Sequence, residues 1–334
     1  HISIVGSGPA GLTAACYLRQ SGYRVTVYEK QKEAGGCLSY AIPAYRLPKE
    51  IVRRFVRALE HMGVAFRCGC SVGTDIQLED IYQDSDGVML DTGTWKRPLI
   101  GLAGEELTRF GLEFLVDVNN YILEKPGSDV VVVGGGNVAM DVAITAKRLG
   151  AANVIMACLE DEKHMPASEE EVARAREEGI VIMNSWGPKE ILRQDGQITG
   201  LVLKRCTQVF DGEGHFSPAY DDGDTETLEG NSILMAVGQK TDLSFLGEEL
   251  ELKVNRGLIS VEPDTLKASL PKVFAVGDVT TGPKTVVAAI ADGKKAAVYV
   301  DSYMTGQPAK NYEHPLGQIV KFDASSSCHS QSAK

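Results

Sequence analysis

Two segments of this sequence share one arrangement of small residues. Residues 6–11 follow the pattern Gly-x-Gly-x-x-Gly, and residues 134–139 follow the pattern Gly-x-Gly-x-x-Ala. In such a pattern the first glycine allows a tight turn, the second lets another group approach the backbone, and the third small residue lets a helix pack closely on a strand. A helix that begins there presents free N–H groups and its positive dipole end. Each segment is therefore typical of a turn that binds the pyrophosphate of a dinucleotide.

Each turn lies between elements that could hold it in place. A strand is expected at residues 2–5, a helix at 12–20 and a second strand at 24–28, which ends at Glu29. The later copy has expected strands at 130–133 and 154–158 around a helix at 140–149, and Glu160 follows its second strand. An acidic side chain at this place can accept hydrogen bonds from a ribose diol. Two such βαβ units predict two nucleotides, the arrangement that a flavin and a nicotinamide require to exchange a hydride.

The remaining elements complete an α/β architecture. The apolar pattern predicts a helix at 49–62 and strands at 63–66, 87–90, 180–182, 198–203, 233–237 and 273–276. A long helix is expected at 285–304, whereas the polar, glycine-rich segment 211–230 indicates a surface hairpin or a loop. The serine-rich end, 324–334, is expected to be mobile.

Length, composition and charge exclude several classes of protein. The chain has 334 residues, enough for about two domains, and 35 of them are glycine, above the usual ~7%. This composition excludes a disordered chain, a coiled coil and a disulfide-rich scaffold, and no apolar run is long enough to span a membrane. The net charge of −11 argues against nucleic acid as the main partner, because phosphate binding needs a basic surface.

The cysteines and the first residue bear on compartment and completeness. Seven cysteines are scattered without the spacing of a disulfide framework, which is typical of a reduced cytoplasmic protein. Cys68 and Cys70 have no further cysteines nearby, which favours structural roles over ligation of a cluster. The chain opens with His1, and its first strand follows at once, which indicates a missing N-terminus or one lobe of a larger protein.

Longer runs of the sequence resemble a known family. They are ISIVGSGPAGLTAA, VTVYEK, IPAYRLPKEIV, DTGTWK, VVVVGGGNVAMDVAITAKRLGA, MAVGQ and VFAVGDVTTGPKTVVAAIADGKKAA. In this order they resemble the flavin half of the glutamate synthase small subunit and the related N-terminal part of dihydropyrimidine dehydrogenase. The resemblance covers most of the chain, and the runs YRLPK and GGNVAMD distinguish it from ordinary disulfide reductases.

The resemblance implies two Rossmann-like domains of the glutathione-reductase type, with an NAD(P)H-binding domain inserted into an FAD domain. Residues 1–103 and 241–310 would form the FAD domain, residues 104–240 the nicotinamide domain, and residues 311–334 a C-terminal extension. The residues implied to contact FAD are Gly6, Gly8, Pro9, Ala10, Gly11, Glu29, Lys30, Gly36, Cys37, Arg46, Val72, Thr92, Gly93, Gly277, Asp278, Thr285 and Val286. Those implied to contact the nicotinamide nucleotide are Gly135, Gly136, Asn137, Val138, Ala139, Ala236, Val237 and Gly238. From the residues alone, Arg46 is a solvated cation.

Three departures from the family pattern change what is expected. Relatives that use NADPH carry a basic pair where Leu159 and Glu160 stand. A carboxylate there repels a 2′-phosphate, so NADH is favoured over NADPH, with Lys163 as an alternative cation for a phosphate. The family's cysteine-rich iron–sulfur region is not in this sequence, so the clusters are expected on a missing region or a partner. Cys37 has no second cysteine a few residues on, which argues against a dithiol reductase.

These features predict an FAD-dependent NAD(P)H oxidoreductase module that passes electrons to iron–sulfur clusters of a partner domain or subunit. Because the flavin carries the hydride chemistry, no catalytic side chain and no metal ligand is expected. The larger complex could be a glutamate synthase or an electron-bifurcating assembly. Two alternatives stay open: a free-standing reductase of a small acceptor or thioredoxin-like protein, and a structural electron-relay subunit with one inactive nucleotide site.

Overall fold

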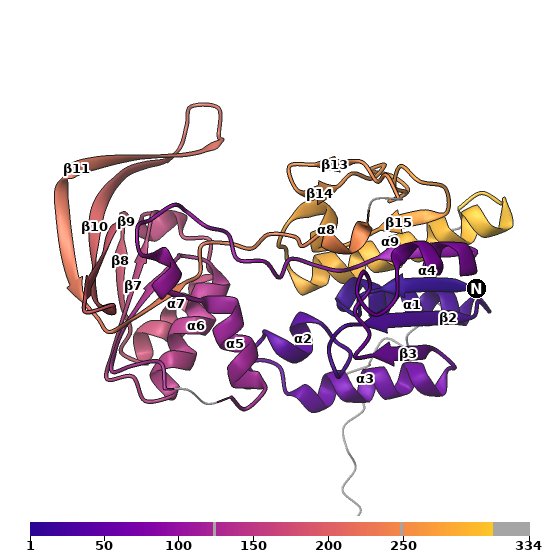
Figure 1. The fold of residues 1–334 in the computed structure, drawn as a ribbon, viewed down its shortest axis with the longest axis horizontal. Coiled ribbons are helices and arrows are strands. Elements are labelled where there is room, and N and C mark those ends of the chain that lie inside the picture. Colours follow the sequence, from indigo (N-terminus) through magenta and orange to yellow (C-terminus); the bar gives the residue numbers. More distant parts are fainter. Residues whose placement is uncertain (123–124, 248–249, 310–334) are drawn as a thin grey trace, which may run out of the picture.

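The computed structural model describes residues 1–122, 125–247 and 250–309, in which two five-stranded parallel sheets lie side by side (Figure 1). The expected C-terminal extension at 311–334, with its serine-rich end, lies outside the described residues. Within the described part, no helix has both the length and the apolar character needed to cross a membrane.

The first sheet combines strands from the beginning and the end of the chain. Its strand order is β15-β4-β1-β2-β3. The strands are β1 (Ile2–Val5), β2 (Val25–Glu29), β3 (Ala65–Cys68), β4 (Gly87–Leu90) and β15 (Val273–Ala275). The last of them pairs with β4 in parallel register, so about 180 residues of intervening chain leave this sheet and return to it.

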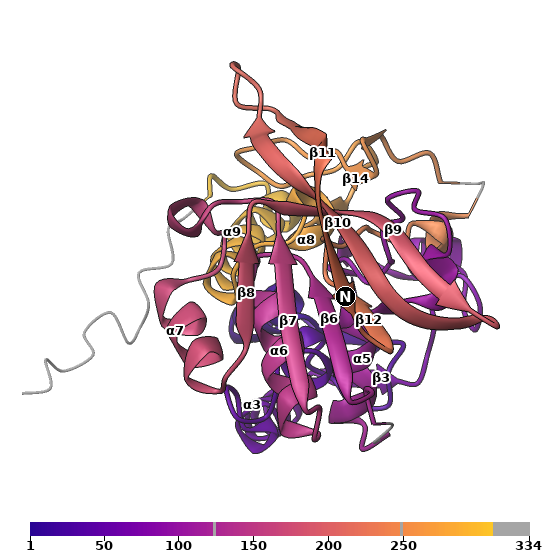
Figure 2. The same ribbon diagram turned by 90° about the vertical axis from the view of Figure 1, so that its left-hand side faces the viewer.

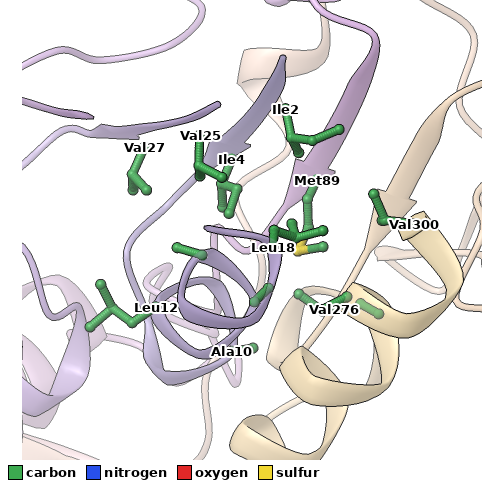
Figure 3. Packing of buried hydrophobic residues seen from close by; sticks show 14 of the residues in the cluster. Ile2, Ile4, Ala10, Leu12, Leu18, Val25, Val27, Met89, Val276 and Val300 are labelled. Atoms are coloured by element: carbon green, nitrogen blue, oxygen red, sulfur yellow. The ribbon is translucent and has the colours of Figure 1, made fainter. Parts of the chain in front are cut away.

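Helices α1 (Pro9–Gln20) and α9 (Val286–Thr305) cover one face of the first sheet (Figure 1). Figure 3 shows Leu18 of α1 and Val300 of α9 in the apolar cluster beneath the strands. The two helices touch closely because residue 293 of α9 is a glycine. A Cβ at this position would collide with the backbone of α1. This packing fixes the start of α1 at the carboxyl end of β1.

The second sheet is built from the middle of the chain. Its order is β5-β12-β6-β7-β8. The strands are β5 (Arg109–Phe110), β6 (Asp129–Val133), β7 (Asn153–Cys158), β8 (Val181–Asn184) and β12 (Ser232–Met235). Figure 2 shows β8, β7, β6 and β12 side by side. Helices α5 (Gly111–Asn119), α6 (Asn137–Arg148) and α7 (Glu169–Glu177) lie on the side that faces the first sheet (Figure 1). The expected fold class, one nucleotide-binding unit inserted into another, is confirmed.

A three-stranded antiparallel sheet covers the outer face of the second sheet. It contains β9 (Trp186–Gln194), β10 (Gln197–Phe210) and β11 (Phe216–Glu229). The segment 211–230, expected to be a surface hairpin or a loop, forms the turn and the second strand of a longer hairpin, because β11 pairs with β10. The sequence analysis did not predict β9, and it placed the end of β10 at residue 203 rather than 210.

Two antiparallel chain segments connect the sheets. Lys96 and Lys240 exchange backbone hydrogen bonds of 2.9 Å, and the Thr94 hydroxyl donates to Gln239 Oε1 at 2.9 Å. The remaining elements are α2 (Cys37–Tyr40), α3 (Lys49–His61), α4 (Leu78–Asp84), α8 (Asp278–Thr281), β13 (Val254–Asn255) and β14 (Leu258–Ile259), together with short 3₁₀ turns. The paired connections lie beside the carboxyl ends of β4 and β12, next to both glycine turns.

Candidate functional site

The first glycine turn brings two stretches of backbone into close contact. Gly6 follows β1 with a φ of +99°, and a Cβ there would collide with the carbonyl oxygen of Asp91. Gly36 has a φ of +53°, and a Cβ there would lie 2.9 Å from the Gly8 Cα. Residues other than glycine rarely adopt these φ angles, and their Cβ atoms would not fit in these spaces. Three of the predicted cofactor residues, Gly6, Gly8 and Gly36, therefore form one backbone cradle.

Helix α1 begins in this cradle. Pro9 is its first residue, followed by Ala10 and Gly11, and the N-cap residue Gly8 provides no side-chain cap. Proline suits this position because the first N–H of a helix has no partner within the helix. The Gly11 N–H donates to Asp91 Oδ2 at 2.6 Å, so a carboxyl group that the sequence analysis did not single out lies at the helix start.

Glu29 links the two halves of the cradle. It is buried at the end of β2 and accepts hydrogen bonds from the Ser7 N–H at 3.1 Å, from the Ser7 hydroxyl and from the Gln31 N–H at 2.7 Å. The Ser7 hydroxyl oxygen in turn accepts from the Gly35 N–H at 2.9 Å. The carboxylate is thus held at the strand end where the sequence predicted a ribose ligand, while the neighbouring Lys30 is exposed.

The other side of this cradle comes from the ends of β4 and β15. The Thr92 hydroxyl is buried and has no hydrogen-bond partner among the described residues. Gly93 has a φ of +66°, and Gly277, with a φ of +67°, is the N-cap of α8. Burial raises the pKa of Asp278, the first residue of α8, and its Oδ1 accepts from the Lys284 N–H at 3.1 Å. An orphaned hydroxyl beside glycine backbone fits a site that a polar ligand completes.

The start of α9 lies on the same side. The Thr285 hydroxyl accepts a hydrogen bond from the Ala288 N–H at 3.2 Å and caps the helix, and Val286 is its first residue. The structure gives Thr285 a structural role as N-cap in addition to its predicted place beside the flavin. Its contact with a cofactor stays a prediction.

Cys37 and Val72 each pack against an apolar cluster. Burial raises the pKa of Cys37 to about 12, and the charges of Asp278 and Asp91 add to the effect, so its thiol is protonated at neutral pH. A thiol in this state is a weak nucleophile. Val72 packs against the apolar cluster beneath α4, beyond the end of β3.

Arg46 is bound to the second sheet's helices. Its Nη1 donates to Asp141 Oδ2 at 2.7 Å, and its Nη2 lies 3.4 Å from Glu171 Oε1. The Tyr45 hydroxyl donates to the other oxygen of Asp141 at 3.2 Å. Burial raises the pKa of Asp141, and Arg46 and Tyr45 oppose that rise. Arg46 therefore joins the two sheets, and its expected contact with the flavin stays a prediction.

The second glycine turn repeats the geometry of the first. Gly134 has a φ of +140°, and a Cβ there would collide with the carbonyl oxygen of Ala236. Gly136 is the N-cap of α6, which Asn137, Val138 and Ala139 begin. A Cβ at Gly135 would lie 2.8 Å from Glu160 Oε2, so this carboxylate faces the turn. Ala236, Val237 and Gly238 continue from β12 along the same edge.

A short segment after β7 closes over the second turn. The Ala167 N–H donates to the Gly135 carbonyl oxygen at 3.1 Å, and the Ser168 N–H donates to Asn137 Oδ1 at 3.0 Å. The predicted binding residue Asn137 is thus already engaged through its side-chain oxygen. Gly136, in contrast, has no heavy atom within 4 Å of its Cβ position, which leaves its side of the turn open.

The residues after Glu160 form a second negative group. Asp161 accepts hydrogen bonds from the N–H groups of Lys163 and His164 and from the His164 imidazole, and His164 holds the pKa of Asp161 below its usual range. Glu162 pairs with Arg176 at 2.6 Å. The nearest basic side chains therefore already have acidic partners, apart from the ammonium group of Lys163, for which the structure gives no ion pair within the described residues.

Both turns fit a bound dinucleotide. Each has a first glycine whose Cβ position is blocked by backbone, a helix that begins after a glycine N-cap with no side-chain cap, and an acidic residue at or just beyond the end of the adjacent strand. The first also has the orphaned Thr92 hydroxyl. Every predicted glycine-turn residue lies in one of these two cradles. Reasoning from the sequence did not point to Asp91, which is adjacent to Thr92, or to Asp141, which follows Ala139 by two residues, and both are buried.

Comparison with known proteins shows the family of the chain. The model of the pyridine nucleotide-disulphide oxidoreductase family matches residues 1–293. The chain is 38% identical to the NADP(+)-dependent formate dehydrogenase subunit beta of Moorella thermoacetica, over 91% of this chain and 44% of that protein. It is 37% identical to a putative glutamate synthase [NADPH] small chain of Cereibacter sphaeroides, over 92% of this chain and 78% of that protein.

A third relative uses the other nucleotide by name. It is the NAD-dependent dihydropyrimidine dehydrogenase subunit PreT of Escherichia coli, 32% identical over 91% of this chain and 68% of that protein. These matches confirm the resemblance on which the sequence analysis relied. The chain spans less than half the length of the formate dehydrogenase subunit that it matches.

Solved structures show the same fold. Mycobacterium tuberculosis FprA in complex with NADPH superposes with a TM-score of 0.76 at 18% identity, over 91% of this chain and 84% of that chain. Lactococcus lactis thioredoxin reductase superposes with a TM-score of 0.70 at 24% identity, over 91% of this chain and 99% of that chain. With its fold, both glycine cradles and the family match over residues 1–293 in agreement, the chain belongs to the pyridine nucleotide-disulphide oxidoreductase family.

Proposed function

We propose that the chain is an FAD-dependent NAD(P)H oxidoreductase module that passes electrons to iron–sulfur clusters of a partner domain or subunit. In this proposal residues 1–103 and 241–310 bind FAD, and residues 104–240 bind the nicotinamide nucleotide. The carrying observation is the pair of glycine cradles, one on each parallel sheet, with their connecting segments paired at Lys96 and Lys240. Bound FAD would accept a hydride from reduced nicotinamide and release electrons one at a time.

The protein's own residues would bind and orient the two nucleotides. The start of α1 and the buried Glu29 would hold the pyrophosphate and ribose of FAD, and Thr92 would gain a hydrogen-bond partner. The start of α6 would hold the pyrophosphate of the nicotinamide nucleotide. No acid or base is needed at the reacting carbon, and Cys37, with its high thiol pKa, would pack rather than react.

We further propose that NADH is preferred over NADPH. The support is the position of Glu160, whose Oε2 faces the Gly135 turn, where it can accept from a ribose 2′-hydroxyl and repel a 2′-phosphate. Of the residues that follow, Asp161 accepts a hydrogen bond from the His164 imidazole, and Lys163 stays the alternative cation for a 2′-phosphate. The names of similar proteins include NADP(+), NADPH and NAD, so the nucleotide preference differs among relatives and is to be measured on this chain.

The iron–sulfur partner is proposed from two sources. The sequence resembles a family whose flavin part delivers electrons to such clusters, and three similar proteins are named as subunits or small chains. A glutamate synthase or an electron-bifurcating assembly is the proposed setting. A ferredoxin with a [4Fe–4S] cluster serves as a probe for this acceptor class.

An anaerobic titration tests the proposal. The purified chain, loaded with FAD, is mixed with NADH or NADPH while the flavin absorbance is recorded. We expect bleaching by NADH, slower bleaching by NADPH, and recovery of the absorbance when the oxidised ferredoxin is added. Absence of bleaching with both nucleotides would overturn the oxidoreductase assignment. Recovery with a thioredoxin-like protein but not with the ferredoxin would overturn the proposed acceptor.

A further inference from the structure

The two nucleotide turns differ in one side chain. Asp91 follows β4 and Ala236 follows β12, and each donates its N–H to the last residue of the neighbouring strand, at 2.7 and 2.8 Å. The carbonyl oxygen of each is the atom that a Cβ on the first glycine of its turn, Gly6 or Gly134, would meet. Asp91 and Ala236 therefore occupy equivalent positions. The first cradle carries a carboxyl group where the second has a methyl group.

The Asp91 carboxyl group lies between three glycines of the first cradle. Its Oδ2 accepts from the Gly11 N–H at 2.6 Å and is 2.8 Å from the Cβ position of Gly8. Its Oδ1 is 3.0 Å from the Cβ position of Gly277. Only 7% of the residue is exposed. The carboxyl group thus occupies an N–H at the start of α1, the part of the cradle that suits a pyrophosphate.

The surroundings of Asp91 favour its neutral form. Burial raises its pKa well above the usual range, and the carboxylates of Asp278 and Glu29 raise it further, while the N–H groups of Gly11 and Gly8 oppose the rise. The thiol of Cys37 also faces this group and is protonated. A bound pyrophosphate would add negative charge to a place that already holds three acidic side chains.

We propose that Asp91 is protonated when the FAD pyrophosphate is bound, so that FAD binding is coupled to the uptake of a proton at this side chain. The inference rests on the proposed assignment of the first cradle to FAD. An ionised Asp91 would repel the pyrophosphate. A protonated Asp91 keeps a carbonyl oxygen as acceptor for the Gly11 N–H and gains an O–H that can donate to a phosphate oxygen.

Two variants of Asp91 test this coupling. Asp91→Asn removes the titration but keeps an acceptor for the Gly11 N–H, and Asp91→Ala introduces the side chain that the chain itself uses at residue 236. The dissociation constant of FAD is measured with the apoprotein by quenching of flavin fluorescence between about pH 6 and pH 10. Proton uptake on mixing with FAD is measured with an indicator dye in weak buffer. Circular dichroism establishes that each variant is folded.

We expect the wild-type dissociation constant, divided by that of Asp91→Asn, to rise about tenfold per pH unit above the pKa of Asp91 in the free protein. Wild type should take up one proton more per FAD than either variant in that range. The control Asp86→Asn changes an exposed carboxylate that pairs with the N-terminus at 2.6 Å, and it should follow wild type. A ratio that stays constant with pH, with equal proton uptake in all variants, would overturn the coupling alone. Failure of every protein to bind FAD would overturn the FAD assignment as well.

Discussion

Replacing Arg46 with alanine tests how the two sheets are held together. The substitution removes a 2.7 Å hydrogen bond to Asp141 and a 3.4 Å ion pair to Glu171. The side chains of Asp141 and Glu171 are each only 7% exposed. Loss of a partner from a fully buried ion pair costs about 3–5 kcal/mol. Because the Arg46 side chain is 28% exposed, water can partly replace it. We therefore expect a loss of about 2–3 kcal/mol in the free energy of unfolding.

Urea unfolding followed by circular dichroism measures this loss as a shift of the midpoint at constant slope. The matched control is Arg53→Ala, which removes a pair with Glu33 whose side chains are about half exposed, 47% and 53%, and it should cost under about 0.5 kcal/mol. A double-mutant cycle with Asp141→Asn should give a coupling energy of at least about 1 kcal/mol. Equal losses for Arg46→Ala and Arg53→Ala would refute the reasoning.

The pH dependence gives a second check on Arg46. Asp141 has a raised pKa chiefly because it is buried, and Arg46 holds that pKa down. Without Arg46 the folded pKa rises further above the unfolded value, so the buried carboxylate destabilises the variant at neutral pH. That penalty disappears as the pH falls through the folded pKa, because the group then binds a proton. The deficit of Arg46→Ala should therefore shrink on acidification, and a deficit that grows would contradict the assigned cause.

Three further predictions concern the cradles and one buried amine. Glu160→Gln should raise the KM for NADH about tenfold, which corresponds to about 1.4 kcal/mol of binding free energy, and should narrow the preference for NADH over NADPH. The control Glu162→Gln should leave the steady-state kinetics with both nucleotides unchanged. Gly36→Ala should abolish FAD retention on gel filtration, because the new Cβ would lie 2.9 Å from the Gly8 Cα. The control Gly69→Ala, at a residue with a φ of +70° and no heavy atom within 4 Å of its Cβ position, should retain FAD. Burial lowers the pKa of Lys49 to about 8, so the unfolded chain holds this proton to higher pH than the folded chain does. Because buried groups away from Lys49 titrate alike in both proteins, the stability of wild type minus that of Lys49→Met should rise from about pH 8 towards pH 10.5, as thermal unfolding would show.

Local sequence patterns carry most of the fold. Buried parallel strands are short apolar runs, and β1 and β4 lie where those runs predicted them, at 2–5 and 87–90. The strand β9 has no such pattern, because Pro188 and charged residues interrupt it, and Trp186 and Ile191 are buried in an apolar cluster with β10 and the second parallel sheet. Helix α7 was not predicted, although its sequence contains a local signal. Ser168 is its N-cap, and the Ser168 hydroxyl accepts a hydrogen bond from the Glu171 N–H at 3.4 Å.

The candidate site divides in the same way. The glycine turns are predictable because one short segment contains the turn, the strand before it and the helix after it. The partners of Arg46 are not predictable in this way, because Asp141 lies 95 residues away and contacts Arg46 only in the folded chain. A solvated arginine and one that joins two sheets have the same local sequence. Only the tertiary structure distinguishes them.

Asp91 lies 80 residues from Gly11, yet the sequence does contain a signal for it. The chain repeats its nucleotide-binding unit, and each copy ends a strand beside its turn with a tripeptide that closes in glycine, Asp-Thr-Gly at 91–93 and Ala-Val-Gly at 236–238. Aligning the two copies by their strand ends places Asp91 opposite Ala236, as the backbone hydrogen bonds of the structure do. The two copies of the unit can therefore be compared with each other. A residue that both copies share serves the turn geometry that both need, and a residue that only one copy has serves the nucleotide of that copy. By this argument the glycines belong to the shared turn, and the carboxyl group of Asp91 belongs to the chemistry of the first cradle alone.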